Sequence, residues 1–274
     1  MSRNFELLQN LGRERDIFAT EVEELDPSPA PMPETETLPS GLPSMDATSI
    51  GAMPELDVKP SQPEMEAGQK DELNKLVQGV FLGPGGDAPR TVVVASTEPG
   101  NGSSWVCARV AEILASHISD PVCVVDANLR TPRLHDEFRV ENHHGLSNAL
   151  RENGSVRGFV RQVGRANLWL LSCGSDANEW SSLVGSERMS MRIAELRREF
   201  RYVLIDGPAL SGANDSVSLG RSAEGVILVL KANASRREVA RKAVQELQAA
   251  KVRVLGAILN HRTFPIPDSI YKKL

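Results

Sequence analysis

A glycine-rich turn is the first feature of this sequence that could do chemistry. The stretch STEPGNGSSW (96–105) connects an apolar run to a segment with helical character. Glycines in such a turn let backbone amides point at an anion, and the start of the helix adds its dipole. Turns of this kind that bind a triphosphate usually end in Gly-Lys-Ser or Gly-Lys-Thr. Here Gly102 is followed by Ser103 and Ser104, so the turn predicts phosphate binding without the usual lysine.

Two carboxylates stand where further apolar runs end. The first run finishes at Asp126, within VVDANLRTPRLH, and a later one, YVLID, finishes at Asp206. A carboxylate beside a phosphate loop suits a magnesium ligand or a group that orients the ion's waters. Each aspartate alone could be an ordinary cap or turn residue. The glycine turn after the first run and the two aspartates at the ends of later runs, in this order, together favour a site for a metal and a nucleotide.

The elements that must position these residues are apolar runs of strand length, separated by helical segments. Six runs are expected to be strands, at 91–95, 121–127, 168–172, 202–206, 225–230 and 252–260. Runs that are apolar throughout and alternate with helices predict an α/β fold, with a parallel sheet covered by helices on both faces. Ligands of such sheets bind at the carboxyl ends of the strands, where the turn and both aspartates are expected.

Composition divides the chain into parts. We expect a short amphipathic helix (1–18), an acidic, proline-rich, disordered linker (19–69), a globular domain (70–264) and a short tail (265–274). The first helix would carry Phe5, Leu8 and Leu11 on one face and could dock on the domain or on another protein. The linker holds nine of the 17 prolines and has too few apolar residues to offset its ordering entropy.

Cysteine usage and hydropathy narrow the class of protein. Cys107, Cys123 and Cys173 are widely spaced in or beside apolar runs, which excludes a disulfide framework and indicates buried, reduced thiols. We find no signal-peptide pattern and no apolar stretch of membrane-spanning length, so we expect a cytoplasmic protein. We expect no nucleic-acid partner.

The globular part resembles the cytoplasmic ATPase domain of bacterial tyrosine kinases (BY-kinases). This family is related to partitioning-type P-loop ATPases and regulates capsular and exopolysaccharide synthesis. The most specific piece is VVDANLRTPRLH, which matches the family's Asp-x-Asp-x-Arg-x-Pro motif at all but one defining position. GLSNAL (145–150), YVLIDGPA with Asn214-Asp215 after it, and the ending VLGAILN also fit. The resemblance spans about residues 70–262 and implies a P-loop NTPase-like fold.

The resemblance also implies roles for particular residues. The implied nucleotide-binding residues are Gly100, Asn101, Gly102, Ser103, Ser104 and, at the adenine, Asn260. The implied metal ligands are Ser104, Asp126 and Asp206, of which the two aspartates are also the catalytic carboxylates. The implied cofactors are ATP or ADP with Mg²⁺, and Tyr271 in the tail is the candidate phosphoacceptor.

Four departures separate the chain from the family pattern. Ser103 occupies the position of the loop lysine, and Asn128 replaces the second aspartate of the motif. The tail carries one tyrosine rather than a cluster. Where the family has Glu-x-x-Arg-x-x-Arg for ring assembly, this chain has Glu72, Lys75 and Gln78.

The loss of the lysine weakens nucleotide binding but leaves the backbone amides and the magnesium ligands. Loss of a preorganised donor to the transition state typically lowers a rate by ~10²–10³. Lys231, which follows the run at 225–230, or Arg130 could replace the missing cation. The opposite view is that Ser103 and Ser104 are only helix N-cap residues and the site is a relic.

Several functions stay open at this point. We favour a domain that regulates exopolysaccharide or capsule synthesis or export, with kinase activity weak or lost, acting through a partner. The alternative is an active, ATP-dependent tyrosine autokinase. A partitioning ATPase would need a second lysine near the loop's start, where Glu98 lies, and an iron–sulfur reductase would need cluster cysteines. The implied partner is a separate membrane-bound polysaccharide co-polymerase, and the chain could also form homo-oligomers.

Overall fold

The structure is a computed structural model that describes residues 65, 67–83, 88–175, 183–211 and 215–261. All of them belong to one unit of the chain, Ser61–Leu274. The predicted N-terminal helix (1–18), almost all of the predicted linker and the tail with Tyr271 lie outside the described residues.

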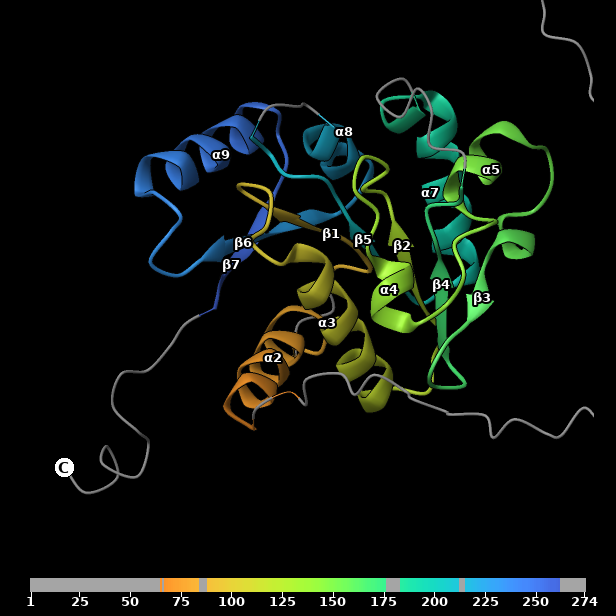
Figure 1. Cartoon of the computed structure of the whole chain (residues 1–274), viewed down its shortest axis with the longest axis horizontal. Coiled ribbons are helices and arrows are strands. Elements are labelled where there is room, and N and C mark those ends of the chain that lie inside the picture. Colours follow the sequence, from red (N-terminus) through yellow and green to blue (C-terminus); the bar gives the residue numbers. More distant parts are fainter. Residues whose placement is uncertain (1–64, 66, 84–87, 176–182, 212–214, 262–274) are drawn as a thin grey trace, which may run out of the picture. The chain divides into compact units, whose positions relative to one another are not determined.

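A seven-stranded sheet forms the centre of the described domain, in the order β3-β4-β2-β5-β1-β6-β7 (Figure 1). The strands are β1 (Thr91–Ser96), β2 (Val122–Asp126), β3 (Arg161–Gln162), β4 (Leu168–Leu171), β5 (Tyr202–Asp206), β6 (Gly225–Lys231) and β7 (Val254–Asn260). All except β3 run parallel, which confirms the predicted parallel sheet. β3 was not predicted and pairs antiparallel with β4, because two residues are too few to show a periodic pattern.

Helices cover both faces of the sheet, as predicted. They are α2 (Ala67–Val80), α3 (Ser103–His117), α4 (Leu134–Phe138), α5 (Leu146–Arg151), α7 (Glu187–Glu199), α8 (Asp215–Ser222) and α9 (Arg237–Ala249), with a short 3₁₀ turn at Val156–Phe159. Figure 1 shows α2 and α3 on one side of the sheet and α7, α8 and α9 on the other. None of the described helices is long and apolar enough to cross a membrane.

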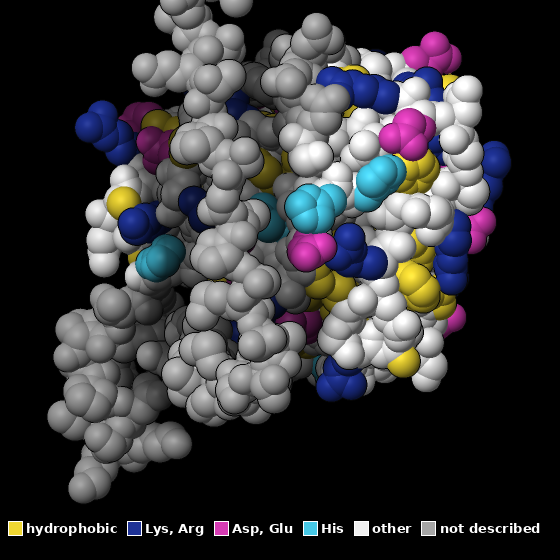
Figure 2. Space-filling view, turned by 45° about the vertical axis from the view of Figure 1, so that its right-hand side comes forward, with side chains coloured by type: hydrophobic (Ala, Val, Ile, Leu, Met, Phe, Trp, Pro, Cys, Tyr) yellow, Lys and Arg dark blue, Asp and Glu magenta, His cyan; other side chains and the backbone are white. Residues whose placement is uncertain are grey.

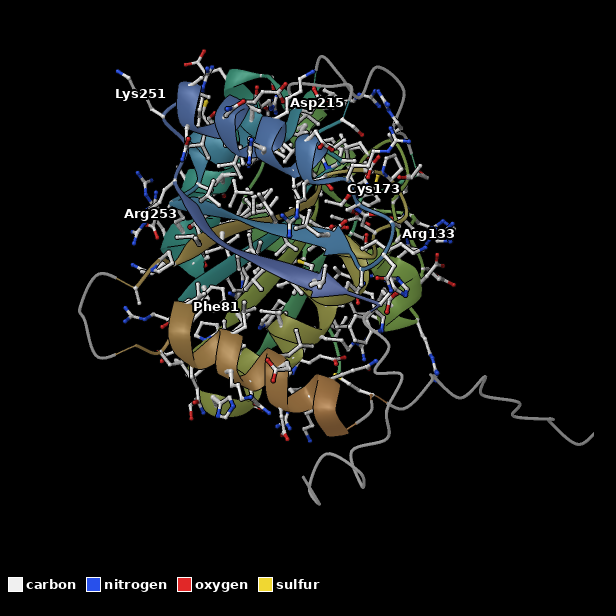
Figure 3. The ribbon with its side chains drawn as sticks, turned by 90° about the vertical axis from the view of Figure 1, so that its left-hand side faces the viewer. Phe81, Arg133, Cys173, Asp215, Lys251 and Arg253 are labelled. Carbon is white, nitrogen blue, oxygen red and sulfur yellow. The ribbon has the colours of Figure 1, made fainter. Side chains whose placement is uncertain are left out.

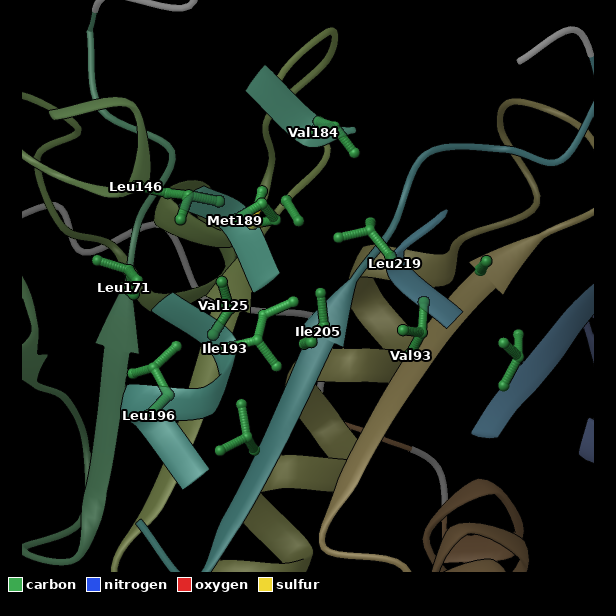
Figure 4. Packing of buried hydrophobic residues seen from close by; sticks show 14 of the residues in the cluster. Val93, Val125, Leu146, Leu171, Val184, Met189, Ile193, Leu196, Ile205 and Leu219 are labelled. Carbon is green, nitrogen blue, oxygen red and sulfur yellow. The ribbon is translucent and has the colours of Figure 1, made fainter. Parts of the chain in front are cut away.

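The alternation of side chains along each strand divides the core into two clusters. Val92 and Val94 of β1 pack on the side of α3, together with its Leu114. Val93 of the same strand packs on the opposite side, with Leu196 of α7. Figure 4 shows the second cluster, where α7 lies over β2 and β5. Strands with two buried faces explain why the predicted runs are apolar throughout.

The exposed face of α2 carries the residues that stand at the family's assembly motif. Glu72, Lys75 and Gln78 are exposed, while Leu73 and Val77 are buried against the domain. Lys75 Nζ lies 2.7 Å from Glu72 Oε1, so this ion pair is formed within the helix.

All three cysteines, Cys107, Cys123 and Cys173, are free and buried, as predicted.

The core that supports the sheet can be tested on α7 alone. Leu196→Ala removes a fully buried side chain and should lower the free energy of unfolding by ~2–5 kcal/mol. Met191→Ala, on the same helix but 64% exposed, should change it by no more than ~0.5 kcal/mol. Urea denaturation of both variants measures the difference. Equal effects would mean that α7 does not pack on the sheet as described.

Candidate functional site

Two glycines shape the loop between β1 and α3. Gly100 and Gly102 have φ of 82° and 85°, a conformation that side-chain-bearing residues rarely adopt. Gly102 is the N-cap of α3, and no side chain caps the helix at this end. Ser103 and Ser104 are therefore the first helical residues, so the view of them as simple N-caps is wrong. The first amides of α3 are left for an anion, which fits a phosphate group.

Asn101 fixes the loop from the inside. Its side chain is buried, and Nδ2 donates to Thr97 Oγ1 at 3.2 Å, to the Val229 carbonyl at 3.4 Å and to Ser235 Oγ at 3.2 Å. The Asn101 carbonyl in turn accepts from Asn260 Nδ2 at 2.9 Å. The Asn101 side chain thus holds the loop to the ends of β1 and β6, and its backbone carbonyl holds it to the end of β7.

Asn260, at the end of β7, lies directly against the loop. A Cβ atom on Gly102 would come within 2.4 Å of Asn260 Nδ2, so a larger residue there would displace the Asn260 side chain. Asn260 Oδ1 accepts from the amide of His261 at 2.9 Å. The side-chain amide therefore already has protein partners at both ends. The adenine contact that the resemblance implies for Asn260 stays a prediction.

Asp126 and Asp206 meet at the carboxyl ends of adjacent strands. They are register partners on β2 and β5, and both are fully buried. Asp126 Oδ2 accepts from the amides of Arg133 at 3.1 Å and Leu134 at 3.0 Å, where α4 begins. Asp126 Oδ1 and both Asp206 oxygens have no hydrogen-bond partner among the described residues. Unpartnered buried oxygens are rare, and these three are free to engage a bound ligand.

The two carboxylates are electrostatically unfavourable as a bare pair. Burial raises the pKa of Asp126 to about 7, although the amides of Leu134 and Arg133 lower it. Burial, and then the neighbouring charge of Asp126, raise the pKa of Asp206 well above its usual range. The hydroxyls of Ser104 and Ser103 are close enough to favour the charged form of Asp206, but not at hydrogen-bonding geometry.

This donor set fits a magnesium ion that arrives with a phosphate. Mg²⁺ is usually held by one or two carboxylates together with phosphate oxygens and waters. In the part of the chain that the structure describes, no group of three or more His, Cys, Asp or Glu side chains could hold a metal on its own. Asp126, Asp206 and the Ser104 hydroxyl would therefore share the ion with a bound nucleotide.

Asn128 and Arg130 follow Asp126 in the loop after β2. Asn128 Oδ1 accepts from the amide and the hydroxyl of Thr131, at 3.4 Å and 3.3 Å, as in a turn. The charge of Arg130 acts on Asp215, whose pKa is raised by burial and lowered by this arginine. Asp215, at the start of α8, was not predicted as a site residue. Its position shortly after YVLIDGPA was the sequence feature that could have indicated one.

Sequence reasoning also missed a cavity beside the loop. It has a volume of about 360 Å³ and lies between α2, the start of α3 and β7. Leu73, Trp105, Ile258 and His261 are among its lining residues. Trp105, directly after the two serines, was the sequence feature that could have indicated this cavity. The cavity could not be predicted from it, because the opposite wall belongs to β7, which is distant in sequence.

Side chains of both charges surround this edge of the sheet. Figure 3 shows Arg133 and Cys173 at the edge where the site lies, opposite Lys251 and Arg253. Figure 2 shows histidines among acidic and basic side chains on a neighbouring face. Arg133 pairs with Asp136 at 3.5 Å in α4.

Comparison with known proteins finds relatives across the described domain. The tyrosine-protein kinase YwqD of Bacillus subtilis is 30% identical over 171 residues, which cover 62% of this chain and 72% of that protein. The putative tyrosine-protein kinase CapB of Staphylococcus aureus is 24% identical over 182 residues, covering 66% and 79%. No family model matches the chain.

Solved structures share the fold. The chimerical protein CapA2B2 superposes with a TM-score of 0.67 at 22% identity, over 74% of this chain and 88% of that chain. The septum site-determining protein MinD of Pyrococcus horikoshii, complexed with Mg-ADP, gives a TM-score of 0.53 at 22% identity, over 67% and 76%. These likenesses confirm the predicted P-loop NTPase-like fold.

The buried carboxylates should make stability depend on pH. Their folded-state pKa values lie above those of the unfolded chain, so the stability they contribute is present below about pH 3.8 and is lost as pH rises, through about 7 for Asp126 and through the well-raised pKa of Asp206. Asp206→Asn should therefore raise the free energy of unfolding at pH 8 by at least ~1 kcal/mol, since one pKa unit is worth about 1.4 kcal/mol. The gain should shrink at pH 5.

Urea denaturation in EDTA at both pH values measures this effect. Asp120→Asn, at an exposed position, is the matched control and should show no such dependence. A constant difference between Asp206→Asn and wild type across this range would contradict the prediction.

Proposed function

Because the chain belongs to the bacterial tyrosine-kinase family, we propose that its domain is a nucleotide-binding regulator of exopolysaccharide or capsule synthesis or export, with weak or lost kinase activity. The link to polysaccharide rests on the family resemblance. The proposal of weak activity rests on the site itself, where a serine stands in place of the loop lysine.

The observation that carries the proposal is that the loop and both aspartates have the shape of a nucleotide site, while the loop lacks the positive charge of a lysine. The left-handed glycines, the uncapped start of α3 and the unpartnered oxygens of Asp126 and Asp206 all suit a magnesium nucleotide. Ser103, in contrast, directs a neutral hydroxyl toward Asp206. Bound Mg-ATP would supply a transferable phosphoryl group, and the residues of the loop and both aspartates would hold and orient it.

The free energy that one charged hydrogen bond contributes indicates whether nucleotide binding is weakened or lost. A hydrogen bond from a charged donor contributes ~1.5–3 kcal/mol, so losing it weakens binding by roughly 10- to 150-fold. The amides and the metal ligands remain, which supports weakened but measurable affinity. The loss of ~10²–10³ in rate that follows from removing a transition-state donor is harder to recover.

The proposed partner is a separate membrane-bound co-polymerase that keeps the domain at the cytoplasmic side of the membrane. The predicted helix at 1–18 would contact this partner, and the acidic linker would act as the spacer. Assembly through α2 would differ from the family pattern, because Lys75 is paired with Glu72 within the helix.

Restoring the lysine tests the proposed function. Ser103→Lys should bind Mg-ATP ~10-fold or more tightly than wild type, because it adds a charged donor to an intact cradle. Ser119→Lys adds the same charge at an exposed position at the other end of α3 and is the control. Calorimetric titration of the full chain measures both variants, and Asp126→Ala should abolish binding.

Two results would contradict this proposal. If neither wild type nor Ser103→Lys binds Mg-ATP, the site is a relic and the nucleotide part of the proposal fails. If wild type transfers phosphate from ATP to itself at a rate close to that of Ser103→Lys, and Tyr271→Phe removes the label, the chain is the active autokinase instead.

The N-terminal helix can be tested for partner binding. Phe5→Ala with Leu8→Ala should markedly reduce the share of the protein recovered with the membrane fraction of its own cells, because the apolar face would be lost. Glu6→Ala with Arg13→Ala changes charged residues of the same segment and is the control. Equal recovery of all variants would contradict a role for this helix in tethering.

A further inference from the structure

The end of β6 lies against the phosphate loop. β6 pairs with β1, and the amide of Thr97 donates to the Val229 carbonyl at 3.3 Å. Asn101 Nδ2 reaches the same carbonyl and also Ser235 Oγ, which accepts from the amide of Lys231 at 2.9 Å. Ser235 therefore ties the backbone of Lys231 to the loop. Lys231 is the last residue of β6, at the carboxyl edge where phosphate is expected.

Strand alternation sets the face toward which Lys231 projects. Ile227 and Val229 pack in the cluster that contains α3, whereas Leu228 packs in the opposite cluster. Successive side chains of a strand point to opposite faces, so Lys231 projects toward the α3 side. The loop turns into α3 on this same side, with its uncapped amides at the start of the helix.

The ammonium group of Lys231 has no partner in the described part of the chain. Its side chain is half-buried, yet no hydrogen bond or ion pair to Nζ is formed there. Lys75, in contrast, is paired with Glu72, and Lys242 is paired with Glu246. The sequence has no lysine between Lys75 and Lys231. A half-buried cation without a partner, beside a loop that lacks its own, suits an incoming anion.

From these observations we infer that Lys231 is the phosphate-binding cation of this site, reaching the nucleotide from β6 in place of the lysine absent from the loop. The inference rests on the proposed nucleotide binding and adds the source of its positive charge. Lysine binds phosphate as a compact point charge, so the contact requires reach rather than a fixed planar geometry.

The test is calorimetric titration of the full chain with Mg-ATP and with inorganic tripolyphosphate. Lys231→Met should weaken both ligands by a similar factor, ~10-fold or more, because the lost contact is to phosphate and not to the base. Lys231→Arg keeps the charge and should retain most of the affinity. Lys242→Met removes a lysine of α9 that pairs with Glu246 and should leave both affinities unchanged. Thermal melts confirm that each variant is folded.

A second arm separates this inference from the function on which it rests. In a Ser103→Lys background the loop has its own cation, so Lys231→Met should reduce the affinity for both ligands much less than it does in wild type. If wild type and Lys231→Met bind tripolyphosphate equally, the inference is overturned while the proposed function stands. If wild type binds neither ligand but Ser103→Lys binds both, the cradle is intact and Lys231 does not replace the lysine. If no variant binds, both the inference and the proposed function fail.

Discussion

Two carboxylates buried side by side are the constraint on which the rest of the site depends. Asp126 and Asp206 end neighbouring strands at the centre of the sheet, where helices on both faces exclude water. The amides at the start of α4 satisfy one oxygen, and three oxygens stay unpartnered among the described residues. Such an arrangement lowers the stability of the free protein, and a divalent cation bound there, as the proposed function requires, would raise it. The core holds both carboxylates in place by itself.

The loop is held by the protein rather than by a ligand. Asn101 and Asn260 connect the ends of β1, β6 and β7 through their side-chain amides, and the glycines accept the turn without strain. These bonds do not involve the side chain of Ser103. Under the proposed function, the shape of the phosphate site and its charge would therefore be set by different residues.

Much of the fold could be predicted because its signals are local. The run YVLID coincides with β5 (Tyr202–Asp206), and the turn after the first run leads into α3 as expected. The antiparallel strand β3 gave no such signal, since its two residues depend on pairing with β4. The inward direction of Asn101 could not be predicted either, because its acceptor on Val229 lies 128 positions away. Residue types at the site were readable, but their orientations were set by distant contacts.

The bond from Asn260 to the loop also has a consequence for biosynthesis. It joins two residues 159 positions apart, and β7 is the last strand of the sheet. During synthesis the glycine turn leaves the ribosome early, whereas Asn260, which bonds to it, emerges only after nearly the whole domain has been made. A nascent or prematurely terminated chain that ends before β7 lacks the side chain that holds the turn closed. The site is thus completed by one of the last described residues to be synthesised.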